Sequence, residues 1–396
     1  MNGSILTLNA GSSSLKFALF EDSESLTQTI RGEIENLDDA PHFRASGMDG
    51  KILAEHSCTT NSFADTLATL LTFFETHLES SSINAIGHRI VHGGANHIAP
   101  AIVTPELLAS LDALTPLDPL HMPPSLAPMH AIAATRPALP QVACFDTAFH
   151  HTLPPVARQF ALPRAISAAG VRRYGFHGLS YEYIAGQLRN QLPELAAGRV
   201  IAAHLGAGAS LCALSNGASI ATTTGFSALD GLVMATRCGR LDPGVLLYLA
   251  AQGHSQADIE HMLYHQSGLL GVSGISGDIR VLLASESPYA KEAIDLFTYH
   301  IACEAGALTS ALGGLDGLVF TAGIGEHAAA IRAGVCARLA WLGIDLDAAA
   351  NTANAQRIST PDSRIAVHVI PTNEEAMIAQ HTQSTYRAHT LQEPAS

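Results

Sequence analysis

The stretch "ILTLNAGSSSLKFALF", residues 5–20, places one glycine and three serines between two apolar runs. It predicts a strand, a tight turn and a second strand, with Lys16 just beyond the turn. Such a turn lets backbone N–H groups and short hydroxyls approach an anion closely, because glycine has no Cβ and serine offers a donor. Lys16 adds a compact positive charge suited to phosphate. A plain hairpin with a solvated lysine is the alternative for this stretch taken alone.

A similar stretch recurs 195 positions later as "VIAAHLGAGASLCALS", residues 200–215. Aligning Gly11 with Gly206 also aligns Asn9 with His204. A repeat at close to half the chain length favours a duplicated domain. Two turns of this kind, one from each domain, are suited to holding opposite ends of one nucleotide.

Composition restricts the possible partners. A chain of 396 residues, 47% of them hydrophobic, fits two α/β domains of about 150 to 200 residues each. The formal net charge of −14 argues against broad contact with nucleic acid or an anionic membrane. Six cysteines without a CxxC pair indicate free thiols in a reducing cytosol. We expect a cytoplasmic protein with no signal peptide and no membrane span.

The first half of the chain alternates predicted helices and strands. A helix is expected over 62–78 and a strand over 83–86, while the proline-rich stretch 115–128 is expected to be irregular. Residues 141–150 predict a strand and then a loop. Asp146 lies at the carboxyl end of that strand, where α/β proteins tend to place ligand contacts. The chain after 150 is expected to be irregular, which places a domain boundary there.

In the second half, residues 317–343 predict a strand, a glycine turn and a helix that ends at Gly343. The turn "GIGEH" opens that helix, whose N-terminal N–H groups can bind an anion or a nucleotide. Near the end, a strand, a turn at 371–373 and a short helix are expected, and that helix can return to the first domain. The predicted domains are 1–147 with 378–396, and 148–377.

Ten ordered segments resemble the acetate kinase family of acetate and propionate kinases: "LNAGSSSLKF", "GHRIVHGG", "PLH", "FDTAFH", "YGFHGLS", "HLGAGAS", "TRCGRLDPG", "SGDIR", "FTAGIGEH" and "IPTNEE". The resemblance covers essentially the whole chain. It implies the actin-like, sugar-kinase and Hsp70 superfamily: an α/β fold of two duplicated actin-like ATPase (ribonuclease H-like) domains with a nucleotide cleft between them.

The resemblance implies reversible, direct in-line transfer of the γ-phosphoryl group of ATP to acetate, giving ADP and acetyl phosphate. It implies a homodimer, with ATP as co-substrate and Mg²⁺ or Mn²⁺ as cofactor. The implied catalytic residues are Asp146, His177 and Arg237. The implied acyl-binding residues are Arg89, Val91, Leu120 and Phe176. Asn9 and Glu374 would place the metal. The implied nucleotide-binding residues are Ser12, Ser14, Lys16, His204, Gly206, Ala207, Gly208, Asp278, Ile279, Arg280, Gly323, Ile324, Gly325, Glu326 and His327.

The chain departs from the family pattern at five positions. Ala207 stands where "HLGNG" has asparagine, so an amide expected near the ATP phosphates is missing. His327 replaces an asparagine, Met122 follows "PLH" where asparagine is usual, and Arg240 replaces aspartate or serine. Ala228 replaces a proline that helps to close the acyl pocket, which favours a larger acceptor. One methylene in an apolar pocket is worth only about 1 to 3 kcal/mol.

Three further interpretations compete with acetate phosphorylation. Propionate or butyrate can be the better acceptor, in keeping with Ala228. A nucleotide-binding paralogue with little turnover would fit the loss of the amide at Ala207. A metal centre built from the 20 histidines fails on spacing, because "GHRIVHGG" and "FHHTLP" lack an HExxH-like arrangement.

Overall fold

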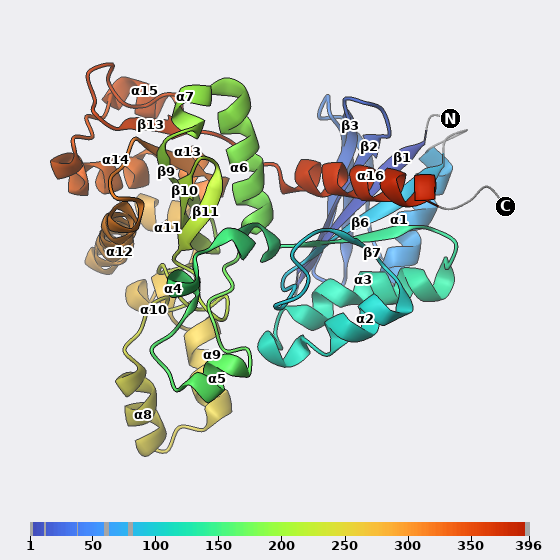
Figure 1. Ribbon diagram of the computed structural model, residues 1–396, viewed down its shortest axis with the longest axis horizontal. Coiled ribbons are helices and arrows are strands. Elements are labelled where there is room, and N and C mark those ends of the chain that lie inside the picture. Colours follow the sequence, from blue (N-terminus) through green and yellow to red (C-terminus); the bar gives the residue numbers. More distant parts are fainter. Residues whose placement is uncertain (1–2, 12, 38, 59–62, 78–81, 393–396) are drawn as a thin grey trace. The chain divides into compact units, whose positions relative to one another are not determined.

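The computed structural model describes residues 3–11, 13–37, 39–58, 63–77 and 82–392. The chain divides into two compact units, which are described separately. Unit 1 comprises Met1–Ala148 and Asn373–Ser396, and unit 2 comprises Phe149–Thr372. Each unit is a mixed sheet with helices packed against it (Figure 1).

The sheet of unit 1 has the strand order β5-β4-β3-β2-β1-β6-β8-β7. β1 pairs antiparallel with β2 and parallel with β6, and β6 pairs parallel with β8. The strands are β1 (Ser4–Ala10), β2 (Ser14–Glu21), β3 (Gln28–Glu35), β4 (His42–Gly47), β5 (Ile52–Ser57), β6 (Ile83–Ile90), β7 (Ala101–Ile102) and β8 (Gln141–Phe145).

The sheet of unit 2 repeats five of these strands in the same order, β11-β10-β9-β12-β13. The strands are β9 (Arg199–Leu205), β10 (Ala209–Ser215), β11 (Ala218–Thr222), β12 (Gly317–Thr321) and β13 (Ala366–Val369). β9 pairs antiparallel with β10 and parallel with β12, as β1 does with β2 and β6. Gly11 N donates to Ser14 O and Gly206 N donates to Gly208 O in the two turns. The predicted duplication is therefore confirmed by the topology.

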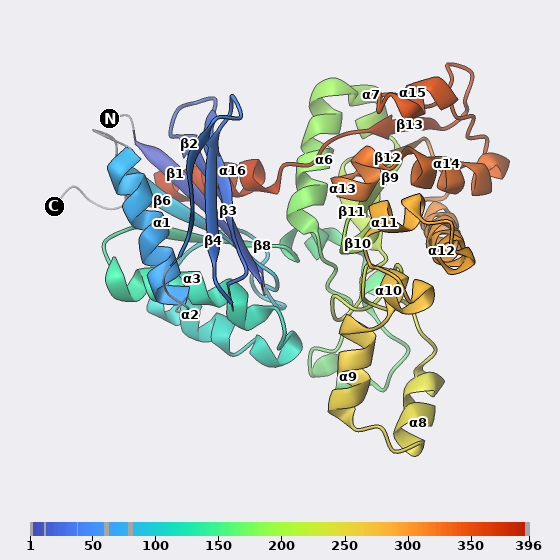
Figure 2. The same ribbon diagram turned by 180° about the vertical axis from the view of Figure 1, so that it is seen from behind.

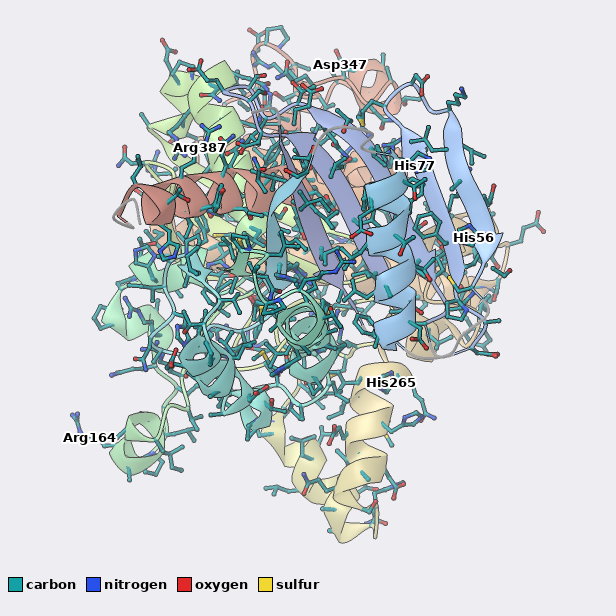
Figure 3. The ribbon with its side chains drawn as sticks, turned by 90° about the vertical axis from the view of Figure 1, so that its right-hand side faces the viewer. His56, His77, Arg164, His265, Asp347 and Arg387 are labelled. Atoms are coloured by element: carbon teal, nitrogen blue, oxygen red, sulfur yellow. The ribbon has the colours of Figure 1, made fainter. Side chains whose placement is uncertain are left out.

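Helices cover both faces of the sheet in unit 1 (Figures 1 and 2). They are α1 (Phe63–His77), α2 (Pro105–Asp112), η1 (Thr115–Leu117), α3 (Met122–Thr135) and α16 (Glu374–Gln392). The short helix η2 (Ala148–Thr152) begins at Ala148 and lies otherwise in unit 2. Leu6 and Leu8 share a core with α1, whereas Ile5 faces α16 through Ala379. This split follows from the two-residue period of a strand. Arg387 of α16, labelled in Figure 3, donates to Asp22 at 2.7 Å.

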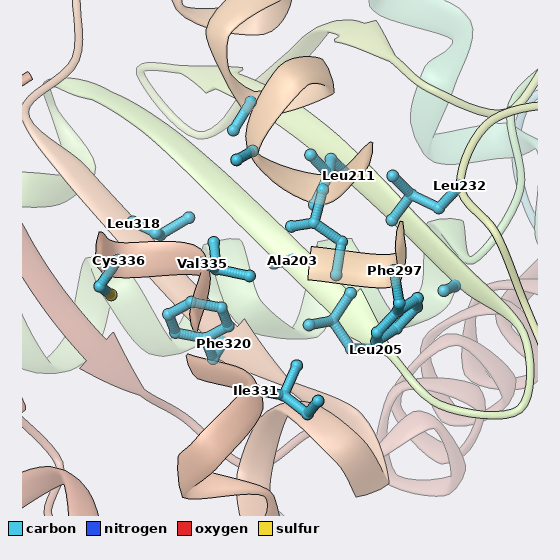
Figure 4. Packing of buried hydrophobic residues seen from close by; sticks show 14 of the residues in the cluster. Ala203, Leu205, Leu211, Leu232, Phe297, Leu318, Phe320, Ile331, Val335 and Cys336 are labelled. Atoms are coloured by element: carbon cyan, nitrogen blue, oxygen red, sulfur yellow. The ribbon is translucent and has the colours of Figure 1, made fainter. Parts of the chain in front are cut away.

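Unit 2 carries the remaining helices: α4 (Pro155–Arg158), α5 (Arg164–Ala168), α6 (Gly178–Gln191), α7 (Pro193–Ala196), α8 (Pro243–Ala251), α9 (Gln256–His265), α10 (Gly268–Ser273), α11 (Ile279–Ala284), α12 (Pro288–Leu312), α13 (Ala322–His327), α14 (Ala329–Arg338), η3 (Ala340–Leu342) and α15 (Ala348–Thr352). Its core joins Leu205 of β9, Phe320 of β12, Phe297 of α12 and Val335 of α14 (Figure 4). This core fixes the end of β9, where the second glycine turn lies, and the end of β12, where α13 begins.

Several expected elements are wrong in extent. The strand predicted over 83–86 continues to Ile90, so Arg89 lies inside it. The proline-rich stretch contains η1 and the first half of α3. Pro123 and Pro124 are tolerated there because they fall in the first turn of the helix, where backbone N–H groups need no partner. The segment after 150 contains short helices, and the helix expected to reach Gly343 is interrupted at Ala328.

The final helix is longer than expected and belongs to unit 1 over its whole length. The structure therefore assigns residues from 373 onward to unit 1, where the sequence predicts only 378–396. Gly87 permits the contact of α16 with β6, because a Cβ at this position would lie 2.1 Å from Thr382 Oγ1.

All six cysteines lie in described ranges, and none of them forms a disulfide. Among the described helices, none combines the length and apolarity needed to span a membrane.

Candidate active site

Four polar side chains of unit 1 come together at the carboxyl ends of its central parallel strands. Asn9 lies near the end of β1, Arg89 near the end of β6, and Asp146 directly after β8. Glu374 is the first residue of α16. Parallel strands end at one edge of a sheet, which is where ligands bind in open α/β sheets. Four sequence-predicted residues are thus brought to one place.

The Arg89 guanidinium is the centre of this group. Its Nη2 donates to Asp146 Oδ2 at 2.5 Å and its Nη1 to Asn9 Oδ1 at 3.3 Å, while Nε lies 3.8 Å from Glu374 Oε2. Burial would lower the pKa of Arg89, but the carboxylates of Asp146 and Glu374 outweigh burial and raise it. Arg89 therefore remains a cation in a site that holds two carboxyl groups.

Burial raises the pKa of Glu374 to about 7, and repulsion from Asp146 adds to this effect. Arg89 acts in the opposite direction. Asp146 is fully buried, and its Oδ1 accepts no hydrogen bond from the residues that the structure describes. These observations indicate surplus oxygen ligands in a small space, which a cation would satisfy.

A small divalent cation fits this donor set. Oxygen ligands from Asn9, Asp146 and Glu374 are of the kind that Mg²⁺ prefers, together with water and substrate phosphates. In the described ranges, no group of three or more His, Cys, Asp or Glu side chains is arranged as a metal cage. Mg²⁺ seldom uses such a cage, since it keeps several waters.

The first glycine turn lies next to this group. Asn9 and Lys16 are directly opposite each other in the β1–β2 register, so their side chains share a face of the sheet. The positive charge of Lys16 lowers the pKa of Glu374, which places the lysine near the carboxylates. Ser14 begins β2, and the predicted nucleotide-binding Ser12 lies outside the described residues.

The predicted acyl-binding residues are divided between the units. Val91 is buried one residue beyond β6, and Leu120 is half-buried before α3 in unit 1. Phe176 is buried in unit 2, where its backbone N donates to Thr224 Oγ1 at 2.9 Å. Their action as one apolar wall stays a prediction.

In unit 2, His177 and Arg237 lie against the second glycine turn. A Cβ on Gly208 would lie 2.9 Å from Arg237 Nη2 and 3.2 Å from His177 Nε2. Arg237 Nη1 donates to Ala228 O at 2.7 Å. A glycine is therefore needed where two nitrogen donors approach the turn, and a substituent on Gly208 would occupy the space in front of them.

The orientation of His177 is set by groups that the sequence analysis missed. Its Nδ1 lies 2.7 Å from Ser210 Oγ, which is also 2.5 Å from the Tyr181 hydroxyl. The His177 ring stacks on His204 with centroids 4.2 Å apart, and His204 Nδ1 lies 2.8 Å from Ser180 Oγ. His177 itself has φ +59° at the start of α6. No pattern in the sequence marks the hydroxyls of Ser210 and Tyr181, because their contact with His177 depends on the packing of β10 against α6.

A cavity of about 520 Å³ in unit 2 collects most of the predicted nucleotide-binding residues. The predicted residues that line it are Gly206, Ala207, Asp278, Ile279, Arg280, Gly323, Ile324 and His327. The lining residues that the sequence analysis missed are Ala235, Gly277, Leu283 and Ala328. The cavity combines apolar side chains with the glycine turn after β9 and with α13, which follows β12 directly, and this suits a flat ring and a polyanion.

Some of the predicted nucleotide-binding residues, inside and outside this lining, also make structural contacts. Asp278 caps α11 and holds Arg280 by a side-chain ion pair of 2.5 Å. Gly325 is buried in α13 and is not among the residues that line the cavity. Glu326 Oε1 accepts a hydrogen bond from Thr372 N at 3.1 Å, and Glu326 lines a separate cavity of about 560 Å³.

Comparison with known proteins identifies the family of the chain. The sequence profile described as "Acetokinase family" matches residues 4–380. An acetate kinase of Rhodopseudomonas palustris is 54% identical over 389 residues, covering 96% of this chain and 98% of the relative. A crystal structure of a propionate kinase from Francisella tularensis has a TM-score of 0.91 at 37% identity, with 96% and 99% coverage.

A crystal structure of Porphyromonas gingivalis acetate kinase has a TM-score of 0.87 at 35% identity, covering 97% of this chain and 99% of the other. These similarities confirm the predicted fold class, two actin-like ATPase domains of α/β type. From the profile match over nearly its whole length and from these relatives, the chain belongs to the acetokinase family.

Proposed function

We propose that this protein is an acetate kinase, which transfers the γ-phosphoryl group of ATP reversibly to acetate and forms acetyl phosphate. The observation that carries the proposal is the buried Arg89 group, in which one guanidinium is fixed by Asp146 and Asn9. The Arg89 side chain is 18% exposed, so part of this cation can be reached by an anionic acceptor. The identity with acetate kinases agrees with this assignment.

The nucleophile in this reaction needs no general base. A carboxylic acid titrates near pH ~4, so acetate is ionised at neutral pH. The difficulty is to bring two anions into line, and catalysis depends on positioning and charge stabilisation. Arg89 would hold the acceptor carboxylate, while the buried carboxyl of Asp146 fixes the guanidinium in place.

His177 and Arg237 would act on the phosphoryl group. Both present a nitrogen to the space above Gly208, in the turn that follows β9. Donors already fixed in this way stabilise the charge that spreads over the transferring group. The cavity lined by Asp278 and Gly323 would hold the adenosine side of ATP. The predicted nucleotide cleft remains part of the proposal.

Mg²⁺, or Mn²⁺, would be held by Asn9 and Glu374, with the unpartnered oxygen of Asp146 as a further ligand. When bound, the ion would neutralise negative charge on the phosphate oxygens.

The proposal also includes a cytoplasmic homodimer. In support of a dimer, Leu247 and Tyr248 of α8 are exposed by 74% and 63%. Light scattering should then give about twice the mass of one 41.4 kDa chain.

Propionate is a second candidate acceptor, because a propionate kinase shares this fold at 37% identity and Ala228 replaces the usual proline. We would compare acetate, propionate and butyrate by trapping the acyl phosphate with hydroxylamine in the presence of ATP and Mg²⁺. The proposal expects the highest kcat/KM for acetate. A higher value for propionate would reassign the substrate.

The same assay tests for a nucleotide-binding paralogue. ATP binding without hydroxamate from any acceptor would contradict the proposed function. Ala207→Asn would then be informative, because the amide would restore a donor beside the cavity. If the missing amide limits turnover, this variant should be faster by about 2- to 10-fold, the value of one hydrogen bond.

A further inference from the structure

The Arg173 side chain donates hydrogen bonds to three successive backbone carbonyl groups. Its Nη1 lies 3.4, 3.0 and 2.6 Å from the carbonyl oxygens of Thr222, Thr223 and Thr224, and 3.4 Å from Asp230 Oδ2. The guanidinium also lies over the Phe160 ring, 5.5 Å from its centroid. The side chain is 22% exposed. Such charge-assisted contacts are stronger than neutral hydrogen bonds.

The chain that follows Arg173 docks along the same loop. Tyr174 N donates to Gly225 O at 3.0 Å, and Phe176 N donates to Thr224 Oγ1 at 2.9 Å. His177 comes next, with the left-handed φ of +59°. The position of His177 before α6 is thus tied to residues 222–225.

The other end of the loop holds Arg237. Ala228 O accepts a hydrogen bond of 2.7 Å from Arg237 Nη1. Between these ends the loop is closely packed, since a Cβ on Gly225 would lie 2.4 Å from Asp230 Oδ2. A shift of residues 222–230 would therefore move the carbonyl that orients Arg237.

We infer that Arg173 is a positioning residue for phosphoryl transfer, which fixes His177 and Arg237 relative to each other through the loop 222–230. The inference rests on the proposed function, because it assigns these two residues to the phosphoryl group. Arg173 would act on Arg237 through the backbone of residues 222–230, and on His177 through residues 174–176. A misplacement of about 1 Å in a catalytic group can cost ~10²-fold in rate.

The test compares Arg173→Met and Arg173→Lys with a matched control, Arg199→Met. Arg199 also lies in unit 2 and makes a comparable set of contacts, with Asp316 and with Gly313 O, at the opposite end of β9 from His204. We expect Arg173→Met to lower kcat by about 10²-fold with the Kd for ATP unchanged. Arg173→Lys should recover part of kcat, and Arg199→Met should retain it.

A second readout does not depend on turnover. The NMR resonance of the His177 ring should shift in Arg173→Met and stay unchanged in Arg199→Met. Equal kcat in the two Met variants, with an unshifted His177 resonance, would overturn the inference. Loss of kcat in step with loss of ATP affinity and of the urea midpoint, without rescue by lysine, would also overturn it. If the wild-type protein forms no acyl phosphate, the proposed function fails, and the resonance still decides whether Arg173 positions His177.

Discussion

Arg89 illustrates how a side chain gains its chemistry from its neighbours. An arginine near a strand end can be predicted from the sequence, but its partners cannot. Asn9, Asp146 and Glu374 are separated from it by long stretches of chain and meet it only through the parallel pairing of β1, β6 and β8 and the docking of α16. Ser210 and Tyr181 beside His177 could not be predicted for the same reason.

Removal of the Arg89 guanidinium should abolish most of the activity. Arg89→Ala is expected to lower kcat/KM for acetate by about 10³-fold, or ~4 kcal/mol of transition-state stabilisation. Arg136 of unit 1, which pairs with Glu75 on the exposed surface, provides the control. Arg136→Ala should keep wild-type kinetics. Similar kinetics for both variants would remove Arg89 from the acceptor site.

His88 should make the protein sensitive to acid. Burial lowers the pKa of His88 from its usual 6.5 to about 3, an effect that the Gln141 amide partly offsets. The native state therefore keeps His88 neutral while the unfolded chain is protonated below pH 6.5. Its stabilising contribution is complete above pH 6.5 and is lost as the pH falls toward 3, at up to about 1.4 kcal/mol per pH unit.

Urea unfolding at a series of pH values would test this effect. His88→Gln should flatten the acid dependence of the free energy of unfolding. His56→Gln provides the control, since His56 is an exposed residue of β5 (Figure 3). The free energy of unfolding of the His56→Gln variant should depend on pH as that of the wild type does. An unchanged slope in His88→Gln would show that His88 does not carry the effect.

At the scale of elements, the contact between α16 and β6 places Glu374 beside Arg89. Gly87→Ala would press a methyl group against Thr382 and Ile378. We expect a loss of about 1 to 3 kcal/mol in stability from overpacking, together with lower kcat because the start of α16 shifts. Urea unfolding and steady-state kinetics measure the two effects.

The control for this helix contact is Gly306→Ala in the middle of α12. Apart from its chain neighbours and the nearby backbone of α12, no described atom lies within 4 Å of a Cβ built there. This variant should be more stable by about 0.5 to 1 kcal/mol, because alanine favours a helix. A Gly87→Ala protein as stable and active as the wild type would mean that α16 is not closely packed on β6.

The elements themselves were predicted with uneven success. Strands β1, β9 and β12 and the glycine turns after β1 and β9 follow from local apolar runs and small residues. The glycine turn expected after β12 is wrong, because residues 322–327 form the helix α13 directly after that strand. The proline-rich start of α3 could not be predicted as helical, because tertiary packing buries Met122 and Leu126 and overrides the local preference. The continuation of β6 to Ile90 depends on its parallel partner β8, which lies far along the chain.

For the whole molecule, the repeat of one short motif predicted the architecture. The two sheets share the strand order around β1 and β9, and the additional strands β4, β5 and β7 occur in unit 1. The sequence predicts that the last helix can return to unit 1, but it predicts a shorter helix than α16.

The most direct test of this account is ³¹P NMR of the purified wild-type protein with ADP, acetyl phosphate and Mg²⁺. Direct transfer between a carboxylate oxygen and the nucleotide predicts that acetyl phosphate decays as ATP appears in equal amount, with little inorganic phosphate. Decay to inorganic phosphate without ATP, or no reaction while ADP binds, would contradict the account.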